Sequence, residues 1–331
     1  MSRVTRSPRP AAADPASAPL PGTGRGAYLT YRLLGGGLQV LPRPAAAGLA
    51  TIAGLLMTEL SPAKRGVVKE NLRRVLGPSA TEAELDRATR EAFDSYAHYW
   101  VEGARLATIT PAEVMRRFVA DGMDHVEEAL GAGTGAVMVL PHLGSWEIGG
   151  YYLTLMGTPM TTVAEPIDPP ELFEWFCSQR EQFGLRILPL SPESPAQLIR
   201  ALRESKLVGL IADRDIQGNG VEVEFFGETA TLPAGPAVLS LRTGAPLLPT
   251  GVFQEPAGMY RGIIRAPIAF ERAGRFRHDV VALTQLIAQE LETLIKRAPT
   301  QWHMFQPVWP EGRAAADAGA AGVSGGPGAP S

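Results

Sequence analysis

Apolar and polar positions divide the chain into two regions with different periodicities. Before about Gly131 the spacing of apolar residues is helical, whereas after it short apolar runs alternate with amphipathic stretches. The runs predict strands at Val137–Leu140, Thr161–Ala164, Arg186–Pro189, Leu207–Ile211, Leu247–Phe253 and Gly262–Ala266, and helices at Pro170–Phe183, Ala196–Glu204 and Val280–Lys296. Strands that alternate with helices indicate an α/β fold, a single domain with a central, mostly parallel sheet flanked by helices.

The region from Tyr28 to about Leu130 is predicted to be helical. Ser61-Pro62 is a typical helix start, because proline suits the first turn, and a second helix is expected over Glu82–Ala107. The aromatic side chains of this second helix, Tyr99 among them, have a spacing more typical of a core than of a binding site.

Two stretches of this helical region raise the question of a membrane. Pro44–Met57 is apolar but shorter than the roughly 20 residues that a membrane-spanning helix needs. Packing in the core and docking at a membrane interface both remain open; core packing is favoured from the residues alone, and a membrane-resident substrate would reverse that preference. The segment Lys64–Arg74 is strongly basic, which predicts either a solvated face or a surface that meets anionic lipid.

Composition places the rest of the 331-residue chain in the ordinary globular range, with 45% hydrophobic and 20% charged residues. A net charge of −3 provides no field for nucleic acid, and Cys177, as the only cysteine, excludes an intrachain disulfide. Residues 1–26 and 311–331 are rich in Pro, Ala and Gly, so we expect disordered tails around a folded domain at 27–310. The single cysteine favours a cytosolic or cytosol-facing protein, and neither tail has the apolar region of a signal peptide.

The segment Val137–Gly150 holds the first candidate for chemistry. His142 and Glu147 come just past the carboxyl end of a buried strand, where open α/β sheets bind ligands. A histidine with a carboxylate beside it is a general base whose tautomer and pKa can be fixed. The H-x4-E spacing suits a strand–turn–helix junction with Glu147 in the first helical turn. The pattern is loose, and a structural histidine is the more common alternative.

Further polar side chains follow other predicted elements. Glu165 ends one strand, Asp213, Arg214 and Asp215 end another, and Arg180 lies late in a helix. Each alone is compatible with a cap or a surface ion pair, but His, Glu and Asp together at the strand ends of one sheet favour a site. Metal binding is disfavoured, because Arg214 between the two aspartates opposes a second positive charge.

The segments that carry these residues also carry a family resemblance. They are Pro141–Glu147, Thr162–Glu165, Arg180-Glu181, Leu188–Leu190, Ala212–Asp215, Phe225–Gly227, Pro233–Pro236, Arg242–Pro246 and Trp302–Met304. Together they resemble bacterial lysophospholipid-type acyltransferases, in the branch that contains the lipid A lauroyl and myristoyl acyltransferases and the actinobacterial phosphatidylinositol mannoside acyltransferases. The resemblance runs from about Tyr28 to Pro310.

The resemblance implies a role for each matching residue. His142 is expected to take the proton from a sugar hydroxyl, Glu147 is the acidic member of the motif, and Asp213 holds and polarises His142. Glu165 and Arg180 match positions that line the catalytic groove.

Two departures from the family pattern affect acidic positions. The chain has Ser145-Trp146-Glu147 where close relatives carry Asn-Trp-Asp, and Asp213 where they carry Glu. Each exchange keeps the charge and moves it by one methylene.

The expected reaction moves a fatty acyl chain from acyl-CoA, a co-substrate, to a mannose hydroxyl of phosphatidylinositol mannoside, with no cofactor or metal. The turn formed by Gly144, Ser145 and Trp146 is a candidate for stabilising the thioester oxyanion through backbone N–H groups. Arg180 and Arg214 suit phosphate or sugar contacts. No nucleophile elbow surrounds Ser145, so direct transfer is favoured over an acyl-serine intermediate.

Both substrates lie at or near a membrane, which predicts peripheral association with the cytoplasmic face of the cell membrane and its anionic surface. Because the catalytic residues do not encode the sugar, another glycolipid acceptor stays open, as does an esterase or thioesterase that uses water. His142, Glu147 and Asp213 argue against a non-catalytic lipid-binding protein.

Overall fold

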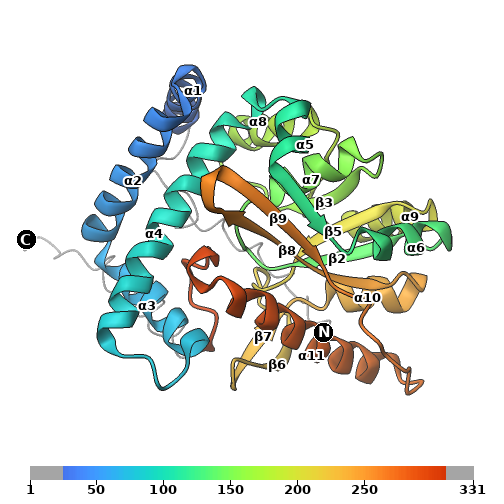
Figure 1. Ribbon diagram of the computed structural model, residues 1–331. Coiled ribbons are helices and arrows are strands. Elements are labelled where there is room, and N and C mark those ends of the chain that lie inside the picture. The colour runs from blue at the N-terminus through green and yellow to red at the C-terminus, as the bar shows by residue number, and fades with distance from the viewer. Residues whose placement is uncertain (1–24, 311–331) are drawn as a thin grey trace, which may run out of the picture.

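A computed structural model describes residues 25–310, which form a central sheet surrounded by helices (Figure 1). The predicted tails lie outside these residues, except that Arg25 and Gly26 already belong to helix α1 (Arg25–Val40).

Seven strands form the central sheet in the order β1-β9-β8-β2-β5-β3-β4. Their bounds are β1 (Phe118–Asp121), β2 (Ala136–Leu140), β3 (Met160–Ala164), β4 (Arg186–Pro189), β5 (Leu207–Ile211), β8 (Leu247–Glu255) and β9 (Met259–Ile264). Every neighbouring pair is parallel except β8 and β9, which confirms the predicted mostly parallel sheet. Strand β1 is absent from the prediction, because only Phe118 of its four residues is buried and no apolar run marks it.

Two apolar cores lie on opposite faces of the sheet. Val137 and Val139 of β2 point into a core shared with α9 (Ser194–Arg203), α10 (Gly235–Thr243) and α11 (Phe276–Arg297). The alternate residues of β2, Ala136, Met138 and Leu140, point into a second core. They share it with α6 (Met123–Gly131) and α7 (Trp146–Leu155). Both faces are therefore covered, which is why the parallel strands read as continuous apolar runs.

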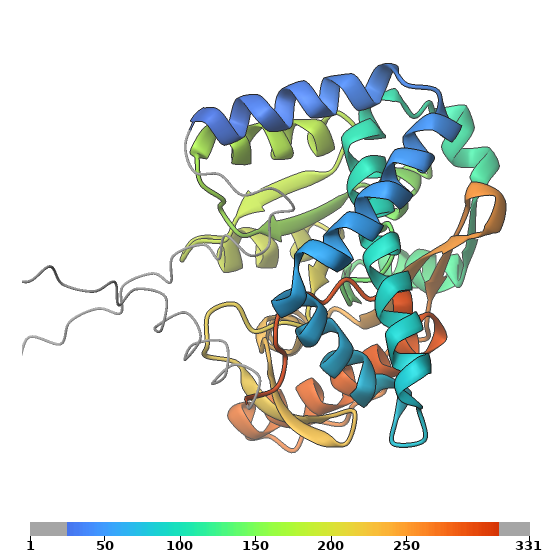
Figure 2. The same ribbon diagram turned by 90° about the vertical axis from the view of Figure 1, so that its left-hand side faces the viewer.

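A separate antiparallel hairpin, β6 (Val221–Phe225) and β7 (Glu228–Leu232), packs on α11. Helix α8 (Pro170–Glu181) lies beneath α1, and Gly35 of α1 lies against the indole of Trp175 (Figure 2).

The remaining N-terminal helices are α2 (Arg43–Leu60), α3 (Pro62–Leu76), α4 (Glu82–Arg105) and α5 (Pro111–Arg117). Of these, α2 and α3 pack on α4, whereas α5 packs on α7 and β1. Helix α4 begins with a capping box between Thr81 and Glu84 and packs between α2 and the rest of the molecule (Figure 1).

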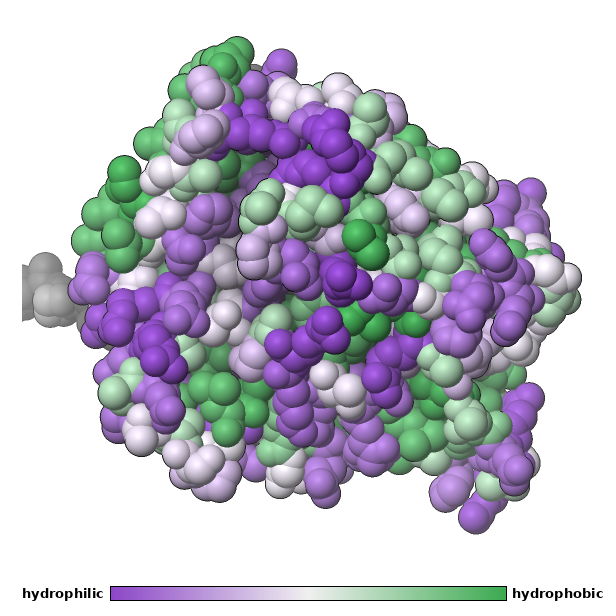
Figure 3. Space-filling view, in the orientation of Figure 1, coloured by the Kyte–Doolittle hydropathy of each residue, from purple (hydrophilic) through white to green (hydrophobic). Residues whose placement is uncertain are grey.

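Helix α2 buries its small residues and exposes its large ones. Ala46, Ala50, Gly54 and Thr58 are buried, and a Cβ on Gly54 would lie 2.8 Å from the Cα of Asp94 in α4. This close approach turns the large apolar side chains outward, namely Leu49, Ile52, Leu55, Leu56 and Leu60, which are 47–77% exposed. Apolar surface follows α1 and α2 along one edge of the molecule (Figure 3). The favoured core packing is therefore wrong for the large side chains of this segment other than Met57, which is partly buried against the core.

No single helix within residues 25–310 is long and apolar enough to cross a bilayer. Helices α2 and α3 meet that criterion only jointly, and the chain bends by 98° between them.

The basic side chains of α3 largely form ion pairs within the protein. Lys69 pairs with Glu82 and Asp86, and Arg73 also reaches Glu82. Arg74 lies 2.8 Å from Glu228 of the β6–β7 hairpin. Of the two predictions for Lys64–Arg74, these ion pairs favour a solvated face over a surface that meets anionic lipid.

Candidate active site

His142 and Asp213 come together because β2 and β5 are parallel neighbours in register. Leu140 pairs with Ile211, so the residues two positions beyond each strand lie side by side. The Nδ1 atom of His142 is 2.6 Å from Oδ1 of Asp213. The Asp213 side chain is fully buried, whereas that of His142 is 32% exposed.

Asp213 is held as an acceptor. Its Oδ2 accepts hydrogen bonds from the backbone N–H of His142 at 2.8 Å and from Nε1 of Trp302 at 2.7 Å. Burial acts to raise the pKa of Asp213, but these hydrogen bonds and the charge of His142 outweigh it, so the pKa lies below its ordinary value. An ionised carboxylate only accepts, so Nδ1 carries the proton and Nε2 keeps a lone pair.

Glu147 does not contact His142 in the way its spacing suggests. It lies in the first turn of α7, as predicted, but its buried carboxylate accepts from the hydroxyl of Tyr99 and from Nη2 of Arg180, each at 2.8 Å. The interpretation that Glu147 fixes the His142 tautomer is wrong, since Asp213 occupies that position. The sequence-based assignment of Tyr99 to the core also does not predict its hydrogen bond to Glu147.

The two arginines expected to meet a phosphate or a sugar are already ion-paired. Arg180 pairs with Glu147, and Arg214 lies 3.0 Å from Glu165, which joins the ends of β5 and β3. The guanidinium of Arg180 also lies over the ring of Trp146, 5.8 Å from its centroid. A substrate anion would have to compete with these carboxylates.

The turn between β2 and α7 passes close to β8. Gly144 has φ +57°, and a Cβ there would lie 2.0 Å from the carbonyl oxygen of Val252, so no other residue fits. The backbone N–H groups of Trp146 and Glu147 open α7 and find no hydrogen-bond acceptor among residues 25–310.

The sequence gives no signal for Glu102, which anchors this turn from α4. Its carboxylate accepts from Ser145 Oγ, from Gln254 Nε2 and from the hydroxyl of Tyr260, each at 2.9 Å. Gln254 also donates to Ser145 Oγ at 3.0 Å. The donors come from the turn, β8 and β9, so only the tertiary fold assembles this cluster.

A second histidine lies behind the first. His303 is buried, its backbone N–H donates to the carbonyl of His142, and its Nε2 is 3.0 Å from Ser95 Oγ. Burial and the charge of His142 lower the pKa of His303 to about 3, so the ring is neutral at physiological pH. In the described part of the chain, no three His, Cys, Asp or Glu side chains are placed to hold a metal ion.

The chain is similar to known acyltransferases over nearly all of its described length. The family model described as bacterial lipid A biosynthesis acyltransferase matches residues 26–311. A phosphatidylinositol mannoside acyltransferase of Mycobacterium tuberculosis is 41% identical over 249 residues, 73% of this chain and 76% of that protein. The protein of the same name from Mycolicibacterium smegmatis is 37% identical over 245 residues, 73% of this chain and 78% of that protein.

More distant similarity extends to lipid A enzymes. A lipid A biosynthesis acyltransferase of Haemophilus influenzae is 23% identical over 230 residues, 68% of this chain and 69% of that protein. The family model and the two mycobacterial relatives lead to one conclusion: this chain belongs to the bacterial lipid A biosynthesis acyltransferase family.

Proposed function

We propose that this protein transfers a fatty acyl chain from acyl-CoA to a mannose hydroxyl of a phosphatidylinositol mannoside, with His142 as the general base. The acceptor follows from the two mycobacterial relatives, which carry that name at 37–41% identity. The observation that supports the chemistry is the His142–Asp213 pair, in which a buried carboxylate fixes the proton on Nδ1 of a partly exposed imidazole.

The reaction is a single displacement. Nε2 of His142 takes the proton of the mannose hydroxyl while its oxygen attacks the thioester carbonyl. The N–H groups of Trp146 and Glu147 stabilise the oxyanion. When the C–S bond breaks, the imidazolium of His142 returns its proton to the CoA sulfur. General-base assistance of this kind contributes about 10²–10⁴-fold to a rate.

The fatty chain needs an apolar space beside this site. The apolar space between α7 and the sheet, lined by Met138, Leu140, Trp146, Met160 and Ile264 among others, has a volume of only about 20 Å³, so these side chains must move apart to admit a fatty chain. Its wall includes Trp146, one of the two residues with an unpaired backbone N–H, so a chain that opens this space would have its carbonyl near the turn.

The exposed apolar face of α2 supports peripheral association with the cytoplasmic face of the membrane. Large apolar patches on a protein surface mark interaction sites, and a helix of this kind lies in the plane of the interface. Replacing Ile52 and Leu56 by Gln should greatly reduce sedimentation with anionic liposomes. Wild-type protein that ignores such liposomes at low salt contradicts the assignment.

The experiment for the reaction follows radiolabelled palmitoyl-CoA with phosphatidylinositol mannosides as acceptor. Wild type should label the glycolipid, and His142→Ala should lose at least about 10²-fold of that rate. His278→Ala, at an exposed histidine outside the site, is the matched control and should keep full activity.

Three results would contradict parts of this proposal. Released free fatty acid in place of acylated glycolipid indicates an esterase or thioesterase. Label in another glycolipid only shows that the acceptor is wrong. An acyl group on Ser145 during turnover replaces the direct transfer by a two-step route.

A further inference from the structure

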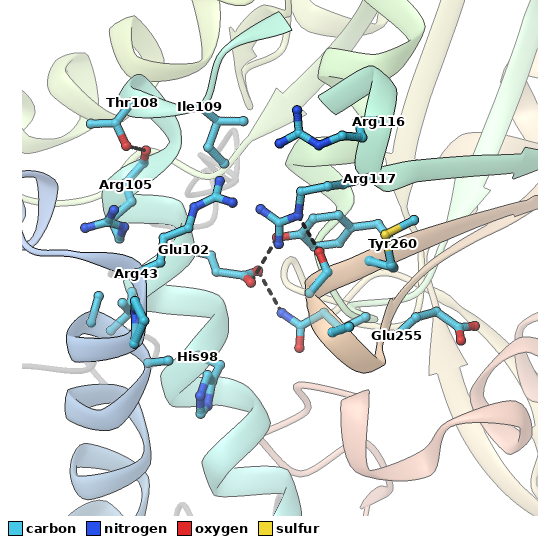
Figure 4. Close-up of a pocket in the computed structure, with 18 residues that line it drawn as sticks. Arg43, His98, Glu102, Arg105, Thr108, Ile109, Arg116, Arg117, Glu255 and Tyr260 are labelled. Atoms are coloured by element: carbon cyan, nitrogen blue, oxygen red, sulfur yellow. Dashed lines mark hydrogen bonds between the residues drawn. The ribbon is translucent and has the colours of Figure 1, made fainter. Parts of the chain in front are cut away.

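A cavity of about 840 Å³ lies between helices α2, α4 and α5 and the β8–β9 hairpin (Figure 4). This volume is within the range of small-molecule sites. Its charged lining consists of four arginines and two glutamates, Arg43, Arg105, Arg116, Arg117, Glu102 and Glu255, beside His98. The cavity therefore has an excess of positive charge and room for a phosphorylated headgroup or a nucleotide.

Three of the arginines are partly engaged in holding the walls together. Arg105 donates to the backbone carbonyls of Leu38 and Leu41, where α1 meets α2. Arg43 pairs with Glu113 at 2.8 Å, and the Nε of Arg117 donates to the carbonyl of Gly258. These contacts fix the cavity before any ligand arrives.

Arg116 differs from the other three. It is exposed and makes no ion pair or hydrogen bond with another residue in 25–310. Arg116 and Arg117 extend from α5 on one side of the cavity, and Arg43 extends from the opposite side (Figure 4). Guanidinium groups that converge in this way match the oxygens of a phosphate, to which arginine binds bidentately.

The inner wall of the cavity adjoins the candidate active site. Glu102 lines the cavity and accepts the hydrogen bond of Ser145, which lies between His142 and Glu147 in the chain. One layer of side chains thus separates a ligand in the cavity from the reacting groups. Arg43 is also at the start of α2, whose outer face is apolar, so the cavity lies near the proposed membrane surface.

We propose that this cavity binds a phosphate group of one of the two substrates, either the phosphodiester of the glycolipid acceptor or the phosphates of the CoA donor. The assignment rests on the proposed function, because that function supplies both phosphate-bearing molecules. It gives the arginines of α2 and α5 a binding role that Arg180 and Arg214, already paired with carboxylates, do not fill.

The test measures binding in the absence of turnover. Isothermal titration of the full chain with glycerophosphoinositol and with coenzyme A compares wild type, Arg116→Gln and Arg116→Lys. Loss of one charge-assisted contact should raise the Kd of one probe about 10-fold or more in Arg116→Gln. Arg116→Lys keeps the positive charge but cannot bind a phosphate bidentately, so its Kd should lie between those of wild type and Arg116→Gln. The probe that is affected identifies the substrate that supplies the phosphate.

Arg90→Gln is the matched control, since Arg90 is exposed on α4 and does not line the cavity. Its Kd values should equal those of wild type, and thermal unfolding should show that all variants fold alike. The proposal is overturned if neither probe binds wild type at millimolar concentration, or if Arg116→Gln binds both as wild type does. A parallel measurement of binding to anionic vesicles completes the test. If Arg116→Gln weakens only vesicle binding, the proposal is also overturned, because the arginines then bind the membrane surface and not a substrate phosphate.

Binding and catalysis give separable answers. Arg116-dependent binding by a protein that acylates no glycolipid would remove the proposed function and keep the phosphate site. Normal acyl transfer with binding indifferent to Arg116 would keep the function and remove the site.

Discussion

Asp213 binds His142 twice, accepting from the side-chain Nδ1 on one carboxylate oxygen and from the backbone N–H on the other. The two bonds fix both the position of the residue and the orientation of its ring. Trp302 donates to the same Oδ2 atom and holds the carboxylate from behind. The imidazole therefore presents Nε2 outward without any rearrangement when a substrate binds.

Asp213→Asn should abolish this arrangement while keeping the volume. The amide places an N–H toward Nδ1 and moves the imidazole proton to Nε2, which can then no longer accept. We expect the rate of acyl transfer to fall about 10³–10⁴-fold. The aspartate-to-asparagine substitution in the Ser-His-Asp triad of a serine protease has an effect of about this size. The glycolipid labelling assay measures it. Asp213→Glu keeps the charge and should retain much more activity; equal activity of Asp213→Asn and wild type would contradict the assignment.

Breaking the buried pair of Glu147 and Arg180 should destabilise the fold. Arg180→Met leaves the carboxylate with only the hydroxyl of Tyr99, and removing one partner of a buried pair typically costs about 3–5 kcal/mol. The double variant Glu147→Gln/Arg180→Met should recover a large part of that loss. Urea unfolding of the two single variants and the double variant tests the coupling, and additive losses would show that the residues do not act as a pair.

His303 should make the protein sensitive to acid. The unfolded chain protonates this histidine near pH 6.5, whereas burial and the charge of His142 lower the pKa to about 3 in the folded state. The folded state therefore binds fewer protons between these values, so this contribution to stability is complete above pH 6.5 and is lost as the pH falls toward 3. The gap corresponds to at most about 5 kcal/mol.

Chemical unfolding between pH 7 and pH 4 measures this contribution. His303→Gln keeps a polar group near Ser95 and should flatten the decline of the free energy of unfolding with falling pH. His278→Gln, at an exposed position, should leave the decline as in wild type. An unchanged slope in His303→Gln would assign the acid sensitivity to other groups.

Gly144→Ala should reduce both stability and activity. The residue has φ +57°, and its Cβ would meet the carbonyl of Val252, so the turn must shift. A left-handed non-glycine residue costs about 1–3 kcal/mol, and a displacement of about 1 Å in a catalytic group can cost 10²-fold in rate. Gly157→Ala is the control, because φ is +82° there and nothing lies within 4 Å of the added Cβ. Gly157→Ala adds backbone strain without a clash, so it should lose less stability than Gly144→Ala and keep its activity.

Local sequence determines the central strands and the positions of the chemical groups, but it misses β1 and places β9 at Gly262–Ala266 in place of Met259–Ile264. β5 has the predicted bounds and β2 starts one residue earlier, because strands buried on both faces are uninterrupted apolar runs. The edge strand β4 also has the predicted bounds, although only its two central residues are buried. The same runs place His142 and Asp213 just past strand ends. The orientation of α2 is harder to predict from the sequence. Local hydropathy does not show that the small residues of this helix face α4 and that its large residues face outward.

Only the tertiary structure decides which of these groups meet. β2 and β5 are neighbours although β3 and β4 lie between them in the chain, and this order pairs His142 with Asp213 and leaves Glu147 to Tyr99 and Arg180. The arginine cavity likewise takes its walls from α2, α4, α5 and the β8–β9 hairpin. The periodicity of apolar residues in the sequence predicts only which face of its own helix or strand each residue occupies. Partners from distant elements follow from strand order and helix packing, which depend on the whole chain.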